Sequence, residues 1–108
     1  AAQEAAVAGK EAMALAVADG IASIEANLAN ADSLLDSLAT CRKRPKGFAR
    51  DLETMRGNVD GLRSQLVDVQ STADAGEYFE ANAMAGSLLA GLDAAVTDLE
   101  SVKAKLGC

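Results

Sequence analysis

The chain has 108 residues and a net charge of −6 at pH 7; half of it is apolar, with one Tyr, two Phe, no Trp and no His. This length allows one hydrophobic core rather than two, so we expect a single domain over residues 1–108. The missing His excludes the usual catalytic triads, zinc hydrolase sites and di-iron sites, and the acidic balance argues against a specific nucleic-acid partner. We therefore expect no enzyme, with no catalytic residue, no metal and no cofactor.

The first expected helix covers about residues 2–41, where apolar residues recur at alternating steps of four and three. This spacing is a heptad stripe, which marks the buried face of a helix. Its longest uncharged stretch, residues 12–18, is far shorter than the ~20 apolar residues that a membrane span needs, so we expect no transmembrane segment. The stripe continues from Val7 through Ala14, Val17, Ile21, Ile24, Leu28, Ala31, Leu35 and Leu38.

Gly20 leaves one alternative open for this segment. Asp19 and Gly20 together are a helix-ending pair, and a break there would produce a four-helix bundle. The stripe keeps its phase through Gly20, which favours one continuous helix.

The second expected helix spans about residues 47–73 and begins after a loop that holds Pro45 and Gly47. Proline disfavours helical geometry at the residue before it, so the first helix is expected to end near Cys41. The apolar stripe of the second helix again alternates steps of four and three. Its members are Phe48, Leu52, Met55, Val59, Leu62, Leu66 and Val69.

The third expected helix spans about residues 75–106. Asp74 with Glu77 three residues later matches a capping box, and Gly107 is expected to end the helix. Its stripe consists of Tyr78, Ala81, Ala85, Leu88, Leu92, Ala95, Leu99, Val102 and Leu106.

Three long amphipathic helices joined by short loops predict an all-α fold, an antiparallel up-down-up three-helix bundle. Extra apolar residues beside each stripe widen the faces, as is typical of helices that contact two neighbours. The first helix is longer than the second, so its beginning, with Val7, Met13 and Ala14, is expected to extend past the bundle.

The two cysteines, Cys41 and Cys108, follow the first and third helices, whose ends meet at one pole of an up-down-up bundle. We therefore predict a disulfide between them. Structural disulfides persist in oxidising compartments, which indicates export to the periplasm, cell surface or extracellular space. Metal binding by the pair is not expected, because a structural zinc site takes four ligands.

Basic residues cluster near the same pole, while the acidic residues are spread over the rest of the chain. Cations after helix C-termini offset the helix dipoles, but this pole has more of them than that requires. We therefore treat them as candidates for contact with an anionic surface or an acidic partner. The candidates are Arg42, Lys43, Arg44, Lys46, Arg50, Lys103 and Lys105.

Paired carboxylates occur at helical spacing, Asp32 with Asp36 and Glu77 with Glu80, but lie outside the apolar stripes. A catalytic carboxylate gains its perturbed pKa by burial, so we interpret these as surface groups.

Three functions remain open. The favoured hypothesis is an exported binding or scaffold module, of the bacterial cell-envelope or lipoprotein type, that contacts a protein partner through its helix faces and an anion through the basic residues. One alternative is an amphipathic bundle that associates with lipid, and another is a structural module for self-association.

Overall fold

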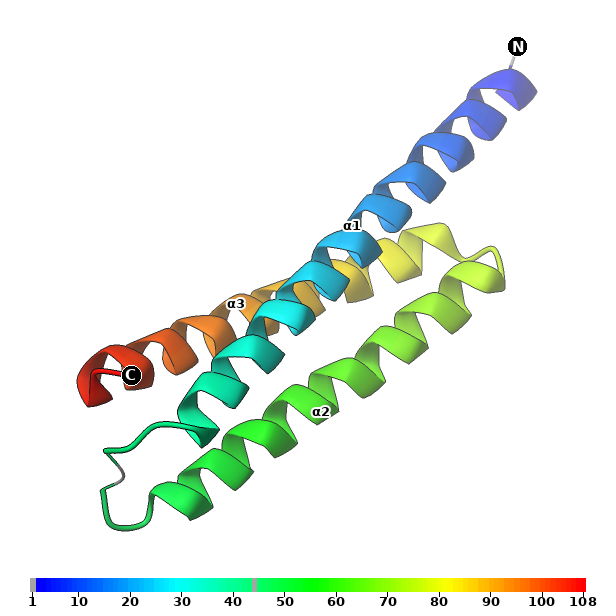
Figure 1. Cartoon of the computed structure of the whole chain (residues 1–108). Helices are drawn as coiled ribbons and strands as arrows, with labels where there is room; N and C mark the ends of the chain where they lie inside the picture. The colour runs from blue at the N-terminus through cyan, green and yellow to red at the C-terminus, as the bar shows by residue number, and fades with distance from the viewer. Residues whose placement is uncertain (1, 44) are drawn as a thin grey trace.

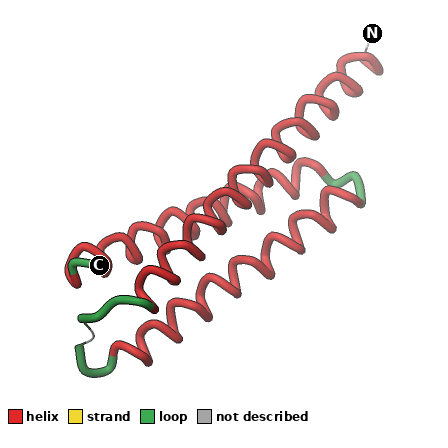
Figure 2. The backbone as a smooth tube through the Cα atoms, in the orientation of Figure 1, coloured by secondary structure: helices red, strands yellow, loops and turns green. Residues whose placement is uncertain are grey.

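The computed structural model describes residues 2–43 and 45–108, with side chains from residue 9 onward. It contains three helices, α1 (Ala2–Ala39), α2 (Phe48–Asp74) and α3 (Tyr78–Leu106), and no strand in the described ranges. The helices α1 and α3 run in the same direction and α2 runs opposite to both (Figures 1 and 2). The predicted all-α, up-down-up three-helix bundle is confirmed, as a rod of 64 × 19 × 15 Å.

The core is built from the three heptad stripes. Burying one Leu or Ile side chain stabilises a fold by roughly 1.5–3 kcal/mol, and no polar or charged residue is buried among the described side chains. The bundle is therefore held together by apolar packing along its length. The largest side chains with less than 2% exposure are Ile24, Leu38, Leu88, Leu92, Leu99, Val17, Val59 and Val69.

Helix α1 passes through Gly20 without a break, so the four-helix alternative is wrong. A β-carbon placed on Gly20 would lie 3.4 Å from Cβ of Ala85 on α3. This is close to an ordinary van der Waals distance, so α1 and α3 lie side by side at Gly20 without requiring a glycine there. Packing of the apolar stripe on both sides of Gly20 outweighs its poor helix propensity.

The predicted capping box at Asp74 is wrong, because Asp74 is the last residue of α2 and Glu77 precedes α3 without a side-chain cap. The turn is set instead by Gly76, whose φ of +82° suits glycine. With Gly76 in this conformation, its N–H donates to the Ala73 carbonyl (2.9 Å) and the Glu77 N–H donates to the Thr72 carbonyl (3.2 Å). These two bonds form a Schellman motif, which lets α2 continue past its predicted end and delays the start of α3.

The other helix ends lie close to their predicted positions. Helix α1 ends at Ala39, two residues earlier than expected, and α2 begins at Phe48. The Cys41 N–H donates to the Leu38 carbonyl (3.2 Å), a shorter-range bond than the α-helical one, so the chain leaves α1 there.

The beginning of α1 extends beyond α2 and α3 (Figure 1). Lys10 lies over the ring of Tyr78, the first residue of α3, with Nζ 5.8 Å from the ring centre. Met13 and Ala14 are partly buried, so the unpartnered part of α1 is shorter than predicted, and the side chain of Val7 lies outside the described ones.

The segment Gly9–Ala39 of α1 is long and apolar enough, in length and composition alone, to cross a membrane. Core helices of bundles and N-terminal signal sequences have the same properties. In this fold the apolar stripe of α1 packs on α2 and α3, and the absence of a transmembrane segment stays a prediction.

Candidate functional site

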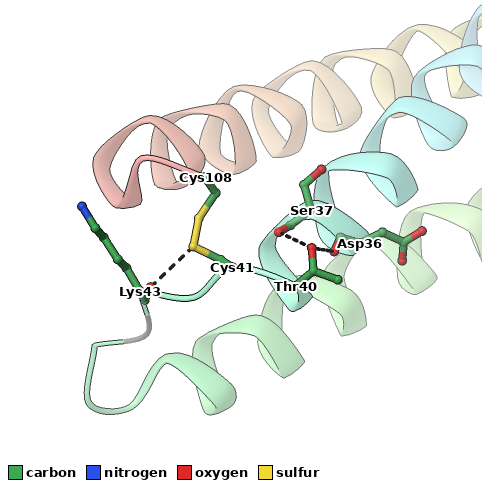
Figure 3. Close-up of a disulfide and its surroundings, with 6 residues drawn as sticks. All are labelled: Asp36, Ser37, Thr40, Cys41, Lys43 and Cys108. Atoms are coloured by element: carbon green, nitrogen blue, oxygen red, sulfur yellow. Dashed lines mark hydrogen bonds between the residues drawn. A yellow bond between two sulfur atoms is a disulfide. The ribbon is translucent and has the colours of Figure 1, made fainter.

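The disulfide pole is the end of the rod where Cys41 and Cys108 lie, together with the loop between α1 and α2. The two cysteines are 67 residues apart in sequence, with Cα atoms separated by 5.5 Å, and the structure joins them in a disulfide (Figure 3). The pairing follows from the topology, since α1 and α3 end at the same pole.

Gly107 positions Cys108 through the backbone. With φ of +71°, Gly107 ends α3 and turns the chain back, so that its own N–H donates to the Ala104 carbonyl (3.3 Å) and the Cys108 N–H donates to the Lys103 carbonyl (3.1 Å). This is the Schellman motif again. It confirms the predicted role of Gly107 and directs Cys108 toward α1.

Thr40 caps the end of α1. Its hydroxyl donates to the carbonyls of Asp36 (3.2 Å) and Ser37 (3.1 Å), as Figure 3 shows. The Cys41 sulfur lies 3.6 Å from the Lys43 carbonyl oxygen. Because a disulfide sulfur carries no hydrogen, this is a sulfur–oxygen contact rather than a donated hydrogen bond.

Beside the disulfide lies a cleft of about 410 Å³. Three of its lining side chains are cationic: Arg42 and Lys43 come from the loop and Lys103 comes from α3. No acidic side chain lines it, and the carboxylate of Asp36, one turn before Thr40, points away from the disulfide (Figure 3). The remaining lining residues are Ser37, Thr40, Cys41, Leu106, Gly107 and Cys108.

Within the described chain, the side chains of Arg42, Lys43 and Lys103 make no hydrogen bond or ion pair. Five carbonyls at the ends of α1 and α3 already accept hydrogen bonds, from the Thr40 hydroxyl and from the N–H groups of Cys41, Gly107 and Cys108. The three cations are therefore not needed to satisfy these carbonyls. The three cations are therefore free to bind an external anion, which would also relieve the repulsion among them.

Three of the seven predicted cationic candidates thus line one cleft. Lys46, Arg50 and Lys105 are exposed but do not line it, and Arg44 lies outside the described residues. Sequence reasoning missed Ser37, Thr40 and Leu106. Their only signal was a position within one helical turn of Cys41 or Cys108.

The paired carboxylates are all exposed, in agreement with their interpretation as surface groups. Asp32 accepts two bonds from one guanidinium nitrogen of Arg63 on α2 (2.6 and 2.8 Å), which links α1 to α2. Among the residues that the structure describes, no cluster of three or more Cys, Asp or Glu side chains is arranged to hold a metal.

A second hollow, of about 470 Å³, lies between α2 and α3. The hollow exists because small residues leave the space between the two helices unfilled by side chains. These residues are Gly57 and Gly61 on α2 and Gly91 and Ala94 on α3. Its lining contains one charged side chain, that of Asp98, and no cation, so it does not attract the anion that the disulfide pole would take.

The fold and the cleft together define a disulfide-closed three-helix bundle with a cationic cleft at one pole. Comparison of the chain with protein-family models, with curated proteins and with solved structures gives no match.

Proposed function

We propose that this chain is a non-enzymatic binding or scaffold module that holds an anionic partner in the cleft at the disulfide pole. One observation carries the proposal: Arg42, Lys43 and Lys103, from two segments far apart in sequence, line a single cleft that has no acidic side chain in its lining.

Electrostatics favours this use of the cleft. A hydrogen bond that involves a charged group contributes roughly 1.5–3 kcal/mol, about twice a neutral one. The rest of the surface is acidic, with a net charge of −6 for the chain, so an anion is repelled elsewhere and attracted to the disulfide pole.

We further propose that the module works outside the cytoplasm, in a bacterial cell envelope. The support is the Cys41–Cys108 disulfide, which is compatible with an oxidising compartment, together with the Ala-rich, acidic composition. Intact mass and thiol labelling of the chain isolated from its own source test the first point, because two free thiols there would contradict export.

The binding test uses tripolyphosphate as the probe and isothermal titration calorimetry as the measurement. The variant R42Q/K43Q/K103Q is expected to lose at least about tenfold in affinity, equal to about 1.4 kcal/mol. The control K46Q/R50Q/K105Q removes an equal number of positive charges, three, from the same pole but leaves the cleft lining unchanged. Equal loss in both variants would show that only net charge matters and would contradict a defined site.

A lipid-associating bundle is the second candidate. It is supported by the span-like composition of Gly9–Ala39 and by three large apolar side chains that are exposed: Leu15 (68%), Val67 (58%) and Phe79 (70%). Co-sedimentation with neutral phosphatidylcholine vesicles, in reducing agent and high salt, tests it. Binding under those conditions would favour this candidate, because neither the cations nor the disulfide would contribute.

Self-association is a third candidate, supported by the part of α1 that extends past the other helices (Figure 1). Light scattering over a wide range of protein concentrations tests it, and a monomer at every concentration would count against it.

A further inference from the structure

The disulfide is itself part of the cleft wall. Cys41 and Cys108 both line the cleft, between the loop cations on one side and Lys103 on the other. Arg42 and Lys43 directly follow Cys41 in the chain, and Lys103 lies one turn and a half before Cys108. The covalent bond therefore brings the two groups of cations to a single place.

The backbone hydrogen bonds that the structure describes for the loop residues other than Arg44 stay within the loop or return to α1 and α2, and none of them reaches α3. Between α1 and Phe48, the loop has its own short-range bonds, from the Cys41 N–H to Leu38 and from the Phe48 N–H to the Pro45 carbonyl (3.0 Å). The helices below it pack independently of the disulfide, with Leu38 at 0% and Leu99 at 1% exposure. Breaking the disulfide is thus expected to release the loop and leave the bundle folded.

The size and chemistry of the cleft indicate a class of ligand. The cleft is an open groove of about 410 Å³, so it has room for a group larger than a bare phosphate ion. The lining combines three cations with two hydroxyls, from Ser37 and Thr40, and with an apolar wall from Leu106 and the disulfide. This combination suits a phosphate ester, in which a charged phosphate is attached to a small organic group.

We infer that the cleft binds a phosphate ester and that the Cys41–Cys108 disulfide controls this binding, so that reduction by a dithiol dismantles the site. The inference rests on the proposed function, because it assigns the ligand class and the regulation of the same cleft.

The chemistry of reduction follows from exposure. Cys108 is exposed, whereas only 9% of the surface of Cys41 is exposed. An incoming thiolate therefore attacks the Cys108 sulfur and displaces Cys41 as a thiolate. The second thiol of the dithiol then releases Cys108 and closes its own disulfide. In total two electrons and two protons pass from the dithiol to the protein, which ends with two thiols.

The experiment titrates the oxidised chain, the chain reduced with dithiothreitol, and the variant C41S/C108S with glycerol 3-phosphate. Dithiothreitol carries no charge at neutral pH, so it does not compete for the cations. Binding to the oxidised chain, with at least tenfold weaker binding to the other two, would support the inference. Circular dichroism in parallel establishes that the helices persist.

Two results overturn the inference in different ways. Equal affinity in all three forms refutes control by the disulfide but leaves anion binding intact. If the oxidised chain binds tripolyphosphate but neither glycerol 3-phosphate nor vesicles of phosphatidylglycerol, the ligand class is wrong. The proposed function fails separately, when the oxidised chain binds no anion at all.

The source of the phosphate ester is resolved by comparing the soluble ester with vesicles of phosphatidylcholine and phosphatidylglycerol in a 3:1 ratio. Binding to either one supports the shared chemistry, and the preferred probe identifies a free metabolite or a lipid headgroup.

If C41S/C108S loses its helices, the same titrations are repeated in the background G57A/G61A/G86A. At these three helical positions an added β-carbon meets no atom within 4 Å, so alanine stabilises the helices. None of the three lines the cleft, and a folded double-serine variant that binds as tightly as the oxidised chain would refute the inference.

Discussion

At each end of the rod, one helix ends in the same backbone conformation. At the disulfide pole Gly107 ends α3, and at the opposite pole, the turn between α2 and α3, Gly76 ends α2. Each glycine has a positive φ, and each is followed by an N–H that donates to a carbonyl five residues earlier. Backbone geometry therefore does not distinguish the poles.

Side chains make the difference. The opposite pole carries exposed acids, Asp74, Glu77 and Glu80, beside a turn of three residues. The disulfide pole has a longer loop, three cations around a cleft and a covalent link between α1 and α3. The same helix ending thus serves as a plain turn at one pole, and at the other it places Cys108 beside a binding surface.

The largest expected effect concerns the covalent link, which only one pole has. The disulfide joins residues 67 positions apart and so limits the conformations of the unfolded chain. Without it the unfolded chain gains entropy, which lowers the stability of the fold by about 4 kcal/mol. We expect C41S/C108S to lower the free energy of unfolding by about that amount in urea denaturation. A loss below about 1 kcal/mol would show that the disulfide has little effect on stability.

Core packing near the two poles gives the next effect. Leu38 on α1 is fully buried near the disulfide pole, whereas Leu15, on the same helix toward the opposite pole, is 68% exposed. Leu38→Ala is expected to cost about 3 kcal/mol through lost burial and a cavity. Leu15→Ala, the matched control, should change stability by less than about 0.5 kcal/mol. Similar losses at both positions would mean that Leu15 is covered in solution.

The two glycines test the shared helix ending. Alanine in the left-handed region costs about 1–2 kcal/mol, so Gly76→Ala and Gly107→Ala should destabilise the chain by similar amounts. Gly86→Ala, within α3 and in open space, is the control and should stabilise by about 0.5–1 kcal/mol. Thermal unfolding measures all three. An unchanged Gly76→Ala variant would contradict the assigned role of that glycine.

The smallest effect lies between the poles, at the ion pair of Arg63 with Asp32. Both side chains are about half exposed (44% and 50%), so Arg63→Ala should cost only about 0.5 kcal/mol. That cost should shrink at high salt because the pair is screened. Arg56→Ala, also an exposed arginine of α2, is the control. Equal effects of both variants would leave the ion pair without measurable influence.

Much of the fold could be predicted because heptad spacing reports burial directly. The stripes through Leu28, Val59 and Leu92 are the ones that the structure buries, and Pro45 and Gly107 correctly marked the helix ends. The predicted capping box at Asp74 was wrong because two local signals lie within three residues: Asp74 as an N-cap of α3, and Gly76 as a glycine that ends α2. The sequence pattern alone does not show which of these two helix ends is the more stable.

The candidate site was predictable only in part. The position of two cysteines at the ends of parallel helices indicated their pairing, and the clustering of cations indicated the pole. Which cations share a cleft depends on where the loop between α1 and α2 runs, and loops lack the periodicity that helices have.

The sequence by itself determined three helices, their buried faces and the pole at which the cysteines meet, because each of these follows from local spacing and chain direction. Only the tertiary structure decided which residue of α3 lies beside Gly20, namely Ala85, whereas the unbroken stripe already favoured a continuous α1. It also decided that Arg42, Lys43 and Lys103 face one cleft while Lys46, Arg50 and Lys105 do not. The physical reason is the same in both cases: these features arise from residues far apart in the chain, whose distances depend on the packing of whole helices.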